Sequence, residues 1–115
     1  MIGKLRISLR ALRHNADVLR RLVGPQRAAF VVKGNAYGHG LLETARALEP
    51  LAARLCVYSA EEALALRSAG ITAPILVMGP TPAEALDEAI AANLELALWK
   101  VDDFAQRLAG AAGRR

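Results

Sequence analysis

Hydrophobic residues along this chain follow two alternating spacings, one typical of helices and one typical of buried strands. The first helical pattern ends at Gly24-Pro25. Its apolar residues lie three or four positions apart, at Leu9, Leu12, Ala16, Leu19 and Val23. Residues 28–33 then form a short continuous apolar run, the pattern of a strand that is buried on both faces. A second helical pattern covers residues 41–48.

The same strand–helix order repeats along the rest of the chain. Three more strands are predicted by apolar runs at 55–58, 75–78 and 94–98. Helix starts are predicted at Ser59 and Thr81, because each is followed three residues later by a glutamate, as in a capping box. A short strand is also expected at 5–9, and a last helix would carry Phe104 and Leu108.

Strands that alternate with helices over short connections predict an α/β fold with a parallel sheet. Two architectures fit this order: an open doubly wound sheet, or a partial (β/α)8 TIM barrel made of about the first four β/α units. A complete barrel takes about 250 residues, so on the barrel interpretation these 115 residues are roughly half of one. Such a piece has two unpaired sheet edges.

Composition narrows the class of protein. The net charge is +4, but the arginines are spread out and aromatic residues make up only 4%, so we expect solvated helix faces and no nucleic-acid partner. The single cysteine, Cys56, excludes an internal disulfide, and no cluster of histidine and acidic residues predicts a metal. No apolar run has the length of a membrane span, so we expect a cytoplasmic protein without a membrane partner.

Lys33 is the strongest candidate for chemistry. It ends an apolar strand, and the loop that follows contains three glycines. Active sites of parallel α/β folds gather at the carboxyl ends of strands, and a lysine that is partly shielded from water there can form a Schiff base. The alternative is a lysine that extends into solvent. Tyr58, after the next strand, could approach the barrel mouth, but packing in the core is the preferred prediction.

The segment 31–40, VVKGNAYGHG, closely resembles the cofactor-lysine motif of alanine racemases, which usually reads VVKANAYGHG. It departs from that motif only at Gly34, where the family commonly has alanine. Segments 7–15 and 62–79 also resemble the family in order and spacing, and the resemblance covers nearly the whole chain, weakening after about Ile90.

The resemblance implies a pyridoxal 5'-phosphate cofactor. It assigns Lys33 both the covalent bond to that cofactor and the role of one of two acid–base groups at the substrate α-carbon. Tyr37 would direct its hydroxyl to the cofactor phosphate. Met78 would lie near the cofactor ring, although core packing is an equally simple role for it.

The implied activity is interconversion of L- and D-alanine, which supplies D-alanine for peptidoglycan. Alanine racemases have a (β/α)8 barrel, a C-terminal β domain and a homodimeric active site, and the second base, a tyrosine, has no counterpart in this chain. Residues 1–115 are therefore expected to be the N-terminal part of such a barrel, truncated, with the activity of the isolated chain left open. Alternatives are a serine or lysine racemase, a pyridoxal-phosphate carrier, and a non-catalytic remnant that binds the cofactor or is purely structural.

Overall fold

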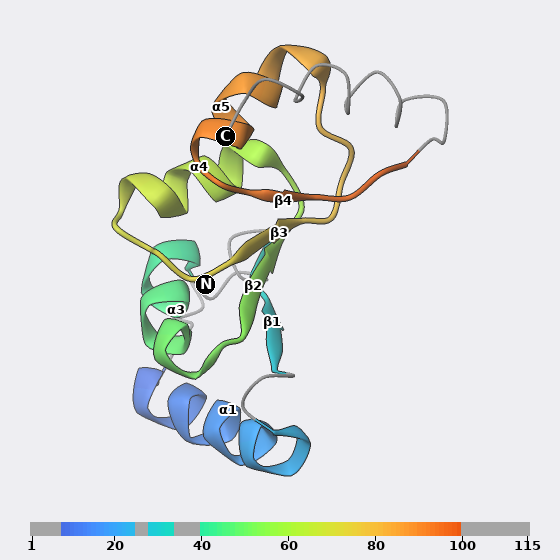
Figure 1. Cartoon of the computed structure of the whole chain (residues 1–115). Coiled ribbons are helices and arrows are strands. Elements are labelled where there is room, and N and C mark those ends of the chain that lie inside the picture. Colours follow the sequence, from blue (N-terminus) through green and yellow to red (C-terminus); the bar gives the residue numbers. More distant parts are fainter. Residues whose placement is uncertain (1–7, 25–27, 34–39, 100–115) are drawn as a thin grey trace, which may run out of the picture.

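The computed structural model describes residues 8–24, 28–33 and 40–99 (Figure 1). The first helix, α1, spans Leu9–Val23 as the apolar spacing predicts. Ser8 caps it, because its hydroxyl accepts a hydrogen bond from the Ala11 amide at 3.2 Å. Gly24 ends it with a positive φ of 92°, a conformation that glycine adopts without strain.

Four parallel strands form the sheet in the order β1-β2-β3-β4. Their bounds are Ala29–Val31, Arg54–Val57, Ile75–Val77 and Glu95–Leu96. Each strand therefore pairs with the next one along the chain. A doubly wound sheet reverses its strand order at a switch point, whereas a (β/α)8 barrel adds strands in sequence. Of the two predicted architectures, the structure is therefore the partial barrel.

Helices cover one face of this sheet. They are α3 (Leu41–Leu48), α4 (Ala60–Ser68) and α5 (Leu86–Ala91), together with the short 3-10 turns η1 (Glu49–Leu51) and η2 (Ala83–Ala85). In Figure 1 the helices follow one another in the order α1, α3, α4, α5, in the same direction as the strands from β1 to β4. The buried core between the layers combines branched strand residues with small helix residues: Val32, Ala45, Leu55, Val57, Ala63, Leu66, Ile75 and Val77.

The opposite face of the sheet has no helix on it among the described elements. Successive strand residues point to opposite faces, so the neighbours of the core residues lie there. We call this surface the open face, and define it by Ala29, Val31, Arg54, Cys56, Leu76 and Glu95. Val31 remains 39% exposed, while Cys56 is buried.

One of the two predicted helix starts is confirmed. Ser59 and Glu62 form the complete capping box, with the Glu62 amide donating to Ser59 Oγ at 3.2 Å and the Ser59 amide donating to Glu62 Oε1 at 3.1 Å. The capping box at Thr81 is wrong, because η2 has no side-chain cap hydrogen bond. Pro82 stays extended with ψ 154°, so the chain turns only from Ala83 onward.

Two predicted elements lie outside the described residues: most of the strand at 5–9, and the last helix with Phe104 and Leu108. Among the helices that the structure does describe, none has the length and apolar character needed to cross a bilayer.

Candidate functional site

The carboxyl edge of the sheet gathers the residues that directly follow the strands. Lys33 comes two residues after β1, Tyr58 one residue after β2, and Met78 one residue after β3. Because all the strands are parallel, these three residues lie at the same edge. The structure therefore places Lys33 and Met78 on the common edge that the sequence predicts.

The backbone directly before Lys33 is hydrogen-bonded to the neighbouring strand, β2. The preceding residue, Val32, donates its amide hydrogen to the Cys56 carbonyl at 2.8 Å, and its side chain is completely buried. Lys33 itself is half-buried. This degree of burial suits a lysine whose aliphatic stem is covered while its amine stays within reach of a ligand.

Tyr58 does not pack in the core, contrary to the sequence prediction. It is 51% exposed, and its ring lies against Gly79. The Gly79 amide donates to the Tyr58 carbonyl at 2.8 Å, and a Cβ added to Gly79 would lie only 2.5 Å from that oxygen. The glycine thus lets the two segments after β2 and β3 approach each other closely at the rim.

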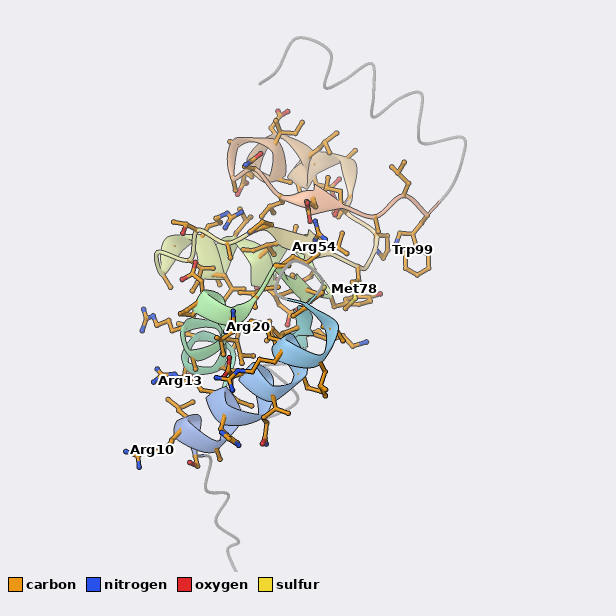
Figure 2. All side chains as sticks on the ribbon, turned by 60° about the horizontal axis from the view of Figure 1, so that its bottom comes forward. Arg10, Arg13, Arg20, Arg54, Met78 and Trp99 are labelled. Atoms are coloured by element: carbon orange, nitrogen blue, oxygen red, sulfur yellow. The ribbon has the colours of Figure 1, made fainter. Side chains whose placement is uncertain are left out.

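Trp99, for which the sequence predicts no role, also lies at this edge (Figure 2). Its indole Nε1 donates to the Met78 carbonyl at 3.0 Å, so it connects the chain after β4 with the chain after β3. The indole ring is 62% exposed. The signal that could have located it is its position at the end of the fourth apolar run, since Lys33 and Met78 lie at the ends of the first and third runs.

Tyr37, the predicted ligand of the cofactor phosphate, lies outside the described residues. Its role stays a prediction.

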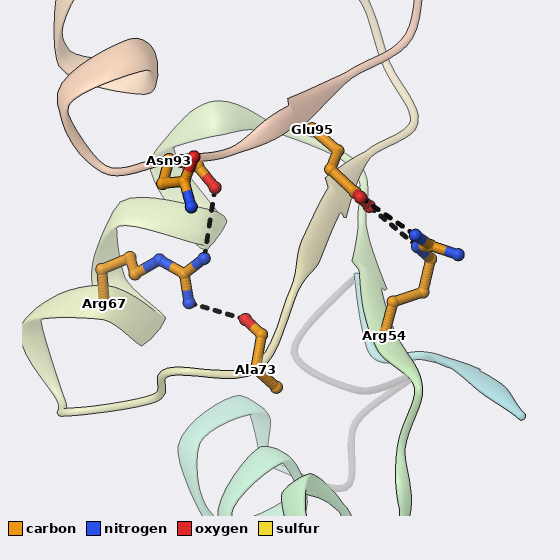
Figure 3. Close-up of polar contacts among 5 residues, drawn as sticks. All are labelled: Arg54, Arg67, Ala73, Asn93 and Glu95. Carbon is orange, nitrogen blue, oxygen red and sulfur yellow. Dashed lines mark hydrogen bonds and ion pairs between the residues drawn. The ribbon is translucent and has the colours of Figure 1, made fainter. Parts of the chain in front are cut away.

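An ion pair crosses the open face below this edge. Arg54 on β2 donates to both carboxylate oxygens of Glu95 on β4, at 2.8 and 2.9 Å, and so spans β3 (Figure 3). These hydrogen bonds lower the pKa of Glu95, although partial desolvation opposes them. Burial raises the pKa of the Cys56 thiol, which fits the predicted small buried residue rather than a reactive one.

The arginines of α1 form a separate cluster. Asp17 accepts from Arg20 at 2.8 Å and pairs with Arg21 at 2.7 Å. The Arg20 hydrogen bond lowers the pKa of Asp17, against a smaller opposing effect of desolvation. Figure 2 shows Arg10 and Arg13 extending away from the ribbon. Asp17 thus neutralises part of the positive charge of α1, in keeping with the predicted solvated helix face.

The amine at the carboxyl edge fits a cofactor that carries an aldehyde. Lys33 is the only lysine among the described residues, so it is the one described primary amine able to condense with an aldehyde at this edge. The described part of the chain contains no group of three histidine, cysteine or acidic residues arranged to hold a metal ion.

A sequential parallel sheet with a lysine at its carboxyl edge defines a lysine-bearing segment of a (β/α)8 barrel. The chain belongs to the alanine racemase N-terminal domain family, which matches residues 7–115. The resemblance of the segment 31–40 to this family is confirmed by a match that extends over nearly the whole sequence.

Individual proteins to which this chain is similar are named alanine racemase. The chain is 41% identical to the alanine racemase of Desulforamulus reducens over 111 residues, which are 95% of this chain and 30% of that protein. It is 47% identical to the alanine racemase of Mycolicibacterium smegmatis over 107 residues, covering 92% of this chain and 28% of the relative. The crystal structure of alanine racemase from Bacillus anthracis with bound L-Ala-P superposes with a TM-score of 0.77 and 37% identity, over 95% of this chain and 31% of that one. The chain thus spans less than a third of these relatives.

Proposed function

We propose that this chain is the N-terminal part of an alanine-racemase-type barrel, and that Lys33 binds pyridoxal phosphate covalently. The observation that carries the proposal is the position of Lys33: it is half-buried, at the carboxyl edge of a parallel sheet, and directly after a residue that β2 holds in place. The names of the relatives, and the bound L-Ala-P of the Bacillus anthracis enzyme, support alanine as the substrate.

Lys33 has two tasks in this proposal. Its amine would hold the cofactor, and the same amine would give or take a proton at the α-carbon of alanine. The bound cofactor supplies an electron sink that stabilises the deprotonated α-carbon. Met78 lies at the same edge, where its thioether would contact the cofactor ring, and Tyr37 would donate its hydroxyl to the phosphate.

The remaining parts of the proposal concern the whole protein. Interconversion of L- and D-alanine, supply of D-alanine for peptidoglycan, a cytoplasmic location and a homodimeric active site are what we expect of a protein that contains this segment. Since the matched relatives are more than three times as long, we also expect turnover to need groups that these 115 residues do not supply.

Cofactor attachment can be tested on the chain itself. The chain is incubated with pyridoxal phosphate, reduced with borohydride, digested and mapped by mass spectrometry. We expect the pyridoxyl label on Lys33, its loss in Lys33→Arg, and full labelling in the control Lys100→Arg. Equal labelling of Lys4, Lys33 and Lys100 would mean unselective condensation and would contradict the proposal.

A racemization assay separates catalysis from binding. Interconversion of D- and L-alanine is measured with added pyridoxal phosphate and without borohydride, for the unchanged chain and for Lys33→Arg. A label on Lys33 without exchange is the result we expect of the chain alone, because it spans so small a share of the active relatives. Exchange that survives Lys33→Arg would contradict the role of this amine.

A further inference from the structure

The register of the sheet places Tyr58 between Lys33 and Met78 at the carboxyl edge. One row of paired residues crosses β1, β2 and β3 and consists of Val31, Cys56 and Leu76. Lys33, Tyr58 and Met78 each follow a member of this row by two positions. Because β2 lies between β1 and β3, Tyr58 comes between the other two at the rim (Figure 1).

The width of β2 determines what a ligand at this edge has to cross. Neighbouring strands of a sheet lie about 4.8 Å apart, so β1 and β3 are separated by about 10 Å. The proposed function gives the same cofactor a covalent bond to Lys33 and a contact with Met78. A group that reaches from one of these residues to the other extends across the end of β2, which is where Tyr58 lies.

The backbone of Tyr58 is held from two sides. Its amide donates to Glu62 Oε1 at 2.9 Å, which joins it to α4. Its carbonyl accepts from the Gly79 amide at 2.8 Å, which joins it to the segment after β3. These two hydrogen bonds fix the point from which the side chain starts.

Gly79 also fixes the Tyr58 ring. The ring atoms Cε1 and Cζ lie 2.9 and 2.8 Å from the position that a Cβ on Gly79 would occupy. The ring therefore rests directly on the glycine, whose missing side chain leaves room for it. A tyrosine side chain has only two torsions, and this contact restricts them, so the ring loses little conformational entropy when a ligand packs on it.

Met78, the neighbour of Tyr58 on β3, is held in the same way. Its amide donates to the Val57 carbonyl at 2.8 Å, and its carbonyl accepts from Trp99 Nε1 at 3.0 Å. The backbone positions of both Tyr58 and Met78 are thus set by hydrogen bonds within the chain before any ligand binds.

We propose that the Tyr58 ring packs against the pyridine ring of pyridoxal phosphate, between Lys33 and Met78. The inference rests on the proposed function and adds to it a residue that positions the cofactor. Aromatic rings attract each other in offset or edge-to-face arrangements, and the thioether of Met78 adds a polarizable surface beside them. The role belongs to the ring, because the ring is the part of the side chain that Gly79 holds.

Titration with pyridoxal phosphate, followed by the absorption of the bound cofactor, tests the proposal. Tyr58→Ala should weaken binding roughly three- to tenfold, the range of an aromatic contact. Tyr58→Leu keeps an apolar side chain beside Gly79 but no aromatic ring, and should weaken binding by a similar factor. Tyr58→Phe keeps the ring and should bind as the unchanged chain does. The control Leu22→Ala removes an exposed apolar side chain from α1 and should leave the affinity unchanged.

Fluorescence of the borohydride-reduced label on Lys33 gives a second measurement that does not depend on affinity. The anisotropy of the pyridoxyl group should be lower in Tyr58→Ala and Tyr58→Leu than in the unchanged chain, because its ring loses a contact that restricts its motion. In Tyr58→Phe the anisotropy should be unchanged. Circular dichroism of each variant shows whether the fold is kept.

The outcomes separate this inference from the proposed function. A Lys33 that takes no label would overturn both. A labelled Lys33 with the same affinity and anisotropy in Tyr58→Leu as in the unchanged chain would overturn the ring contact alone. Equal losses in Tyr58→Phe and Tyr58→Leu would assign the contact to the hydroxyl group and would also overturn the role of the ring.

Discussion

At the scale of single residues, the carboxyl edge depends on close contacts that leave no room for extra atoms. Gly79 contacts both the carbonyl and the ring of Tyr58. This contact keeps the segments after β2 and β3 together beside Met78. It is a property of two residues 21 positions apart, and the apolar pattern around either of them does not reveal it.

Gly79→Ala should destabilise the fold by about 1–3 kcal/mol, the usual cost of forcing a methyl group into a packed site. The reason is that the new Cβ would lie 2.5 Å from the Tyr58 carbonyl oxygen, where the backbone has to shift. Urea unfolding followed by circular dichroism measures the change. Ser68→Thr adds a methyl group at an exposed position of α4 and should alter the free energy of unfolding far less.

At the scale of elements, Arg67 joins α4 to the segments on either side of β3. Its guanidinium donates to the carbonyls of Ala92 at 2.8 Å, Ala73 at 2.7 Å and Ile71 at 3.0 Å, and more weakly to the Asn93 carbonyl at 3.4 Å. Figure 3 shows the contacts with Ala73 and Asn93. One side chain thus fixes the start of β3 and the turn before β4 relative to the same helix.

Arg67→Lys should therefore cost about 1–3 kcal/mol in unfolding free energy even though it keeps the charge, because a single ammonium group cannot reach carbonyls in several directions. Arg46→Lys is the control, since Arg46 is exposed and, among the described residues, its side chain makes one long hydrogen bond, 3.5 Å to the Ala69 carbonyl. Equal losses for the two variants would contradict the special role of Arg67.

Glu49 connects η1 with the segment before β3 and should make stability depend on pH. Burial alone would raise its pKa, but hydrogen bonds from the amides of Ala73 and Thr72 outweigh burial, and the pKa is lowered from its ordinary 4.5. A carboxyl whose pKa is lower in the folded state stabilises the fold above its unfolded pKa, and this contribution disappears as the pH falls through the folded value.

The free energy of unfolding should accordingly fall as the pH is taken from 6 to about 3, and part of that fall should be absent in Glu49→Gln. Urea titrations at several pH values measure both curves. Glu95 and Asp17 also have lowered pKa values and contribute to the acid loss in both proteins. Parallel curves for the two proteins would show that Glu49 contributes nothing to the pH dependence.

At the scale of the whole molecule, the described fold is half of a closed architecture. Helices cover one face of its four strands, and among the described elements no helix covers the other face and no further strand pairs with β1 or β4. The helix α1 is amphipathic as predicted, but Leu19 and Leu22 on it remain 54% and 76% exposed. These two residues fit the helical apolar spacing, but spacing does not say how many partners surround a helix.

The sequence by itself determined most of the local elements and singled out Lys33 as the position proposed to react. Apolar spacing, the Ser59 capping box and the segment around Lys33 all act over a few neighbouring residues, so one-dimensional reasoning can find them. Only the tertiary structure decided the strand order, which selects the barrel over the doubly wound sheet. It alone brought Tyr58 onto Gly79, Trp99 onto Met78 and Arg54 onto Glu95, because these contacts join residues from different strands and depend on how the sheet is assembled.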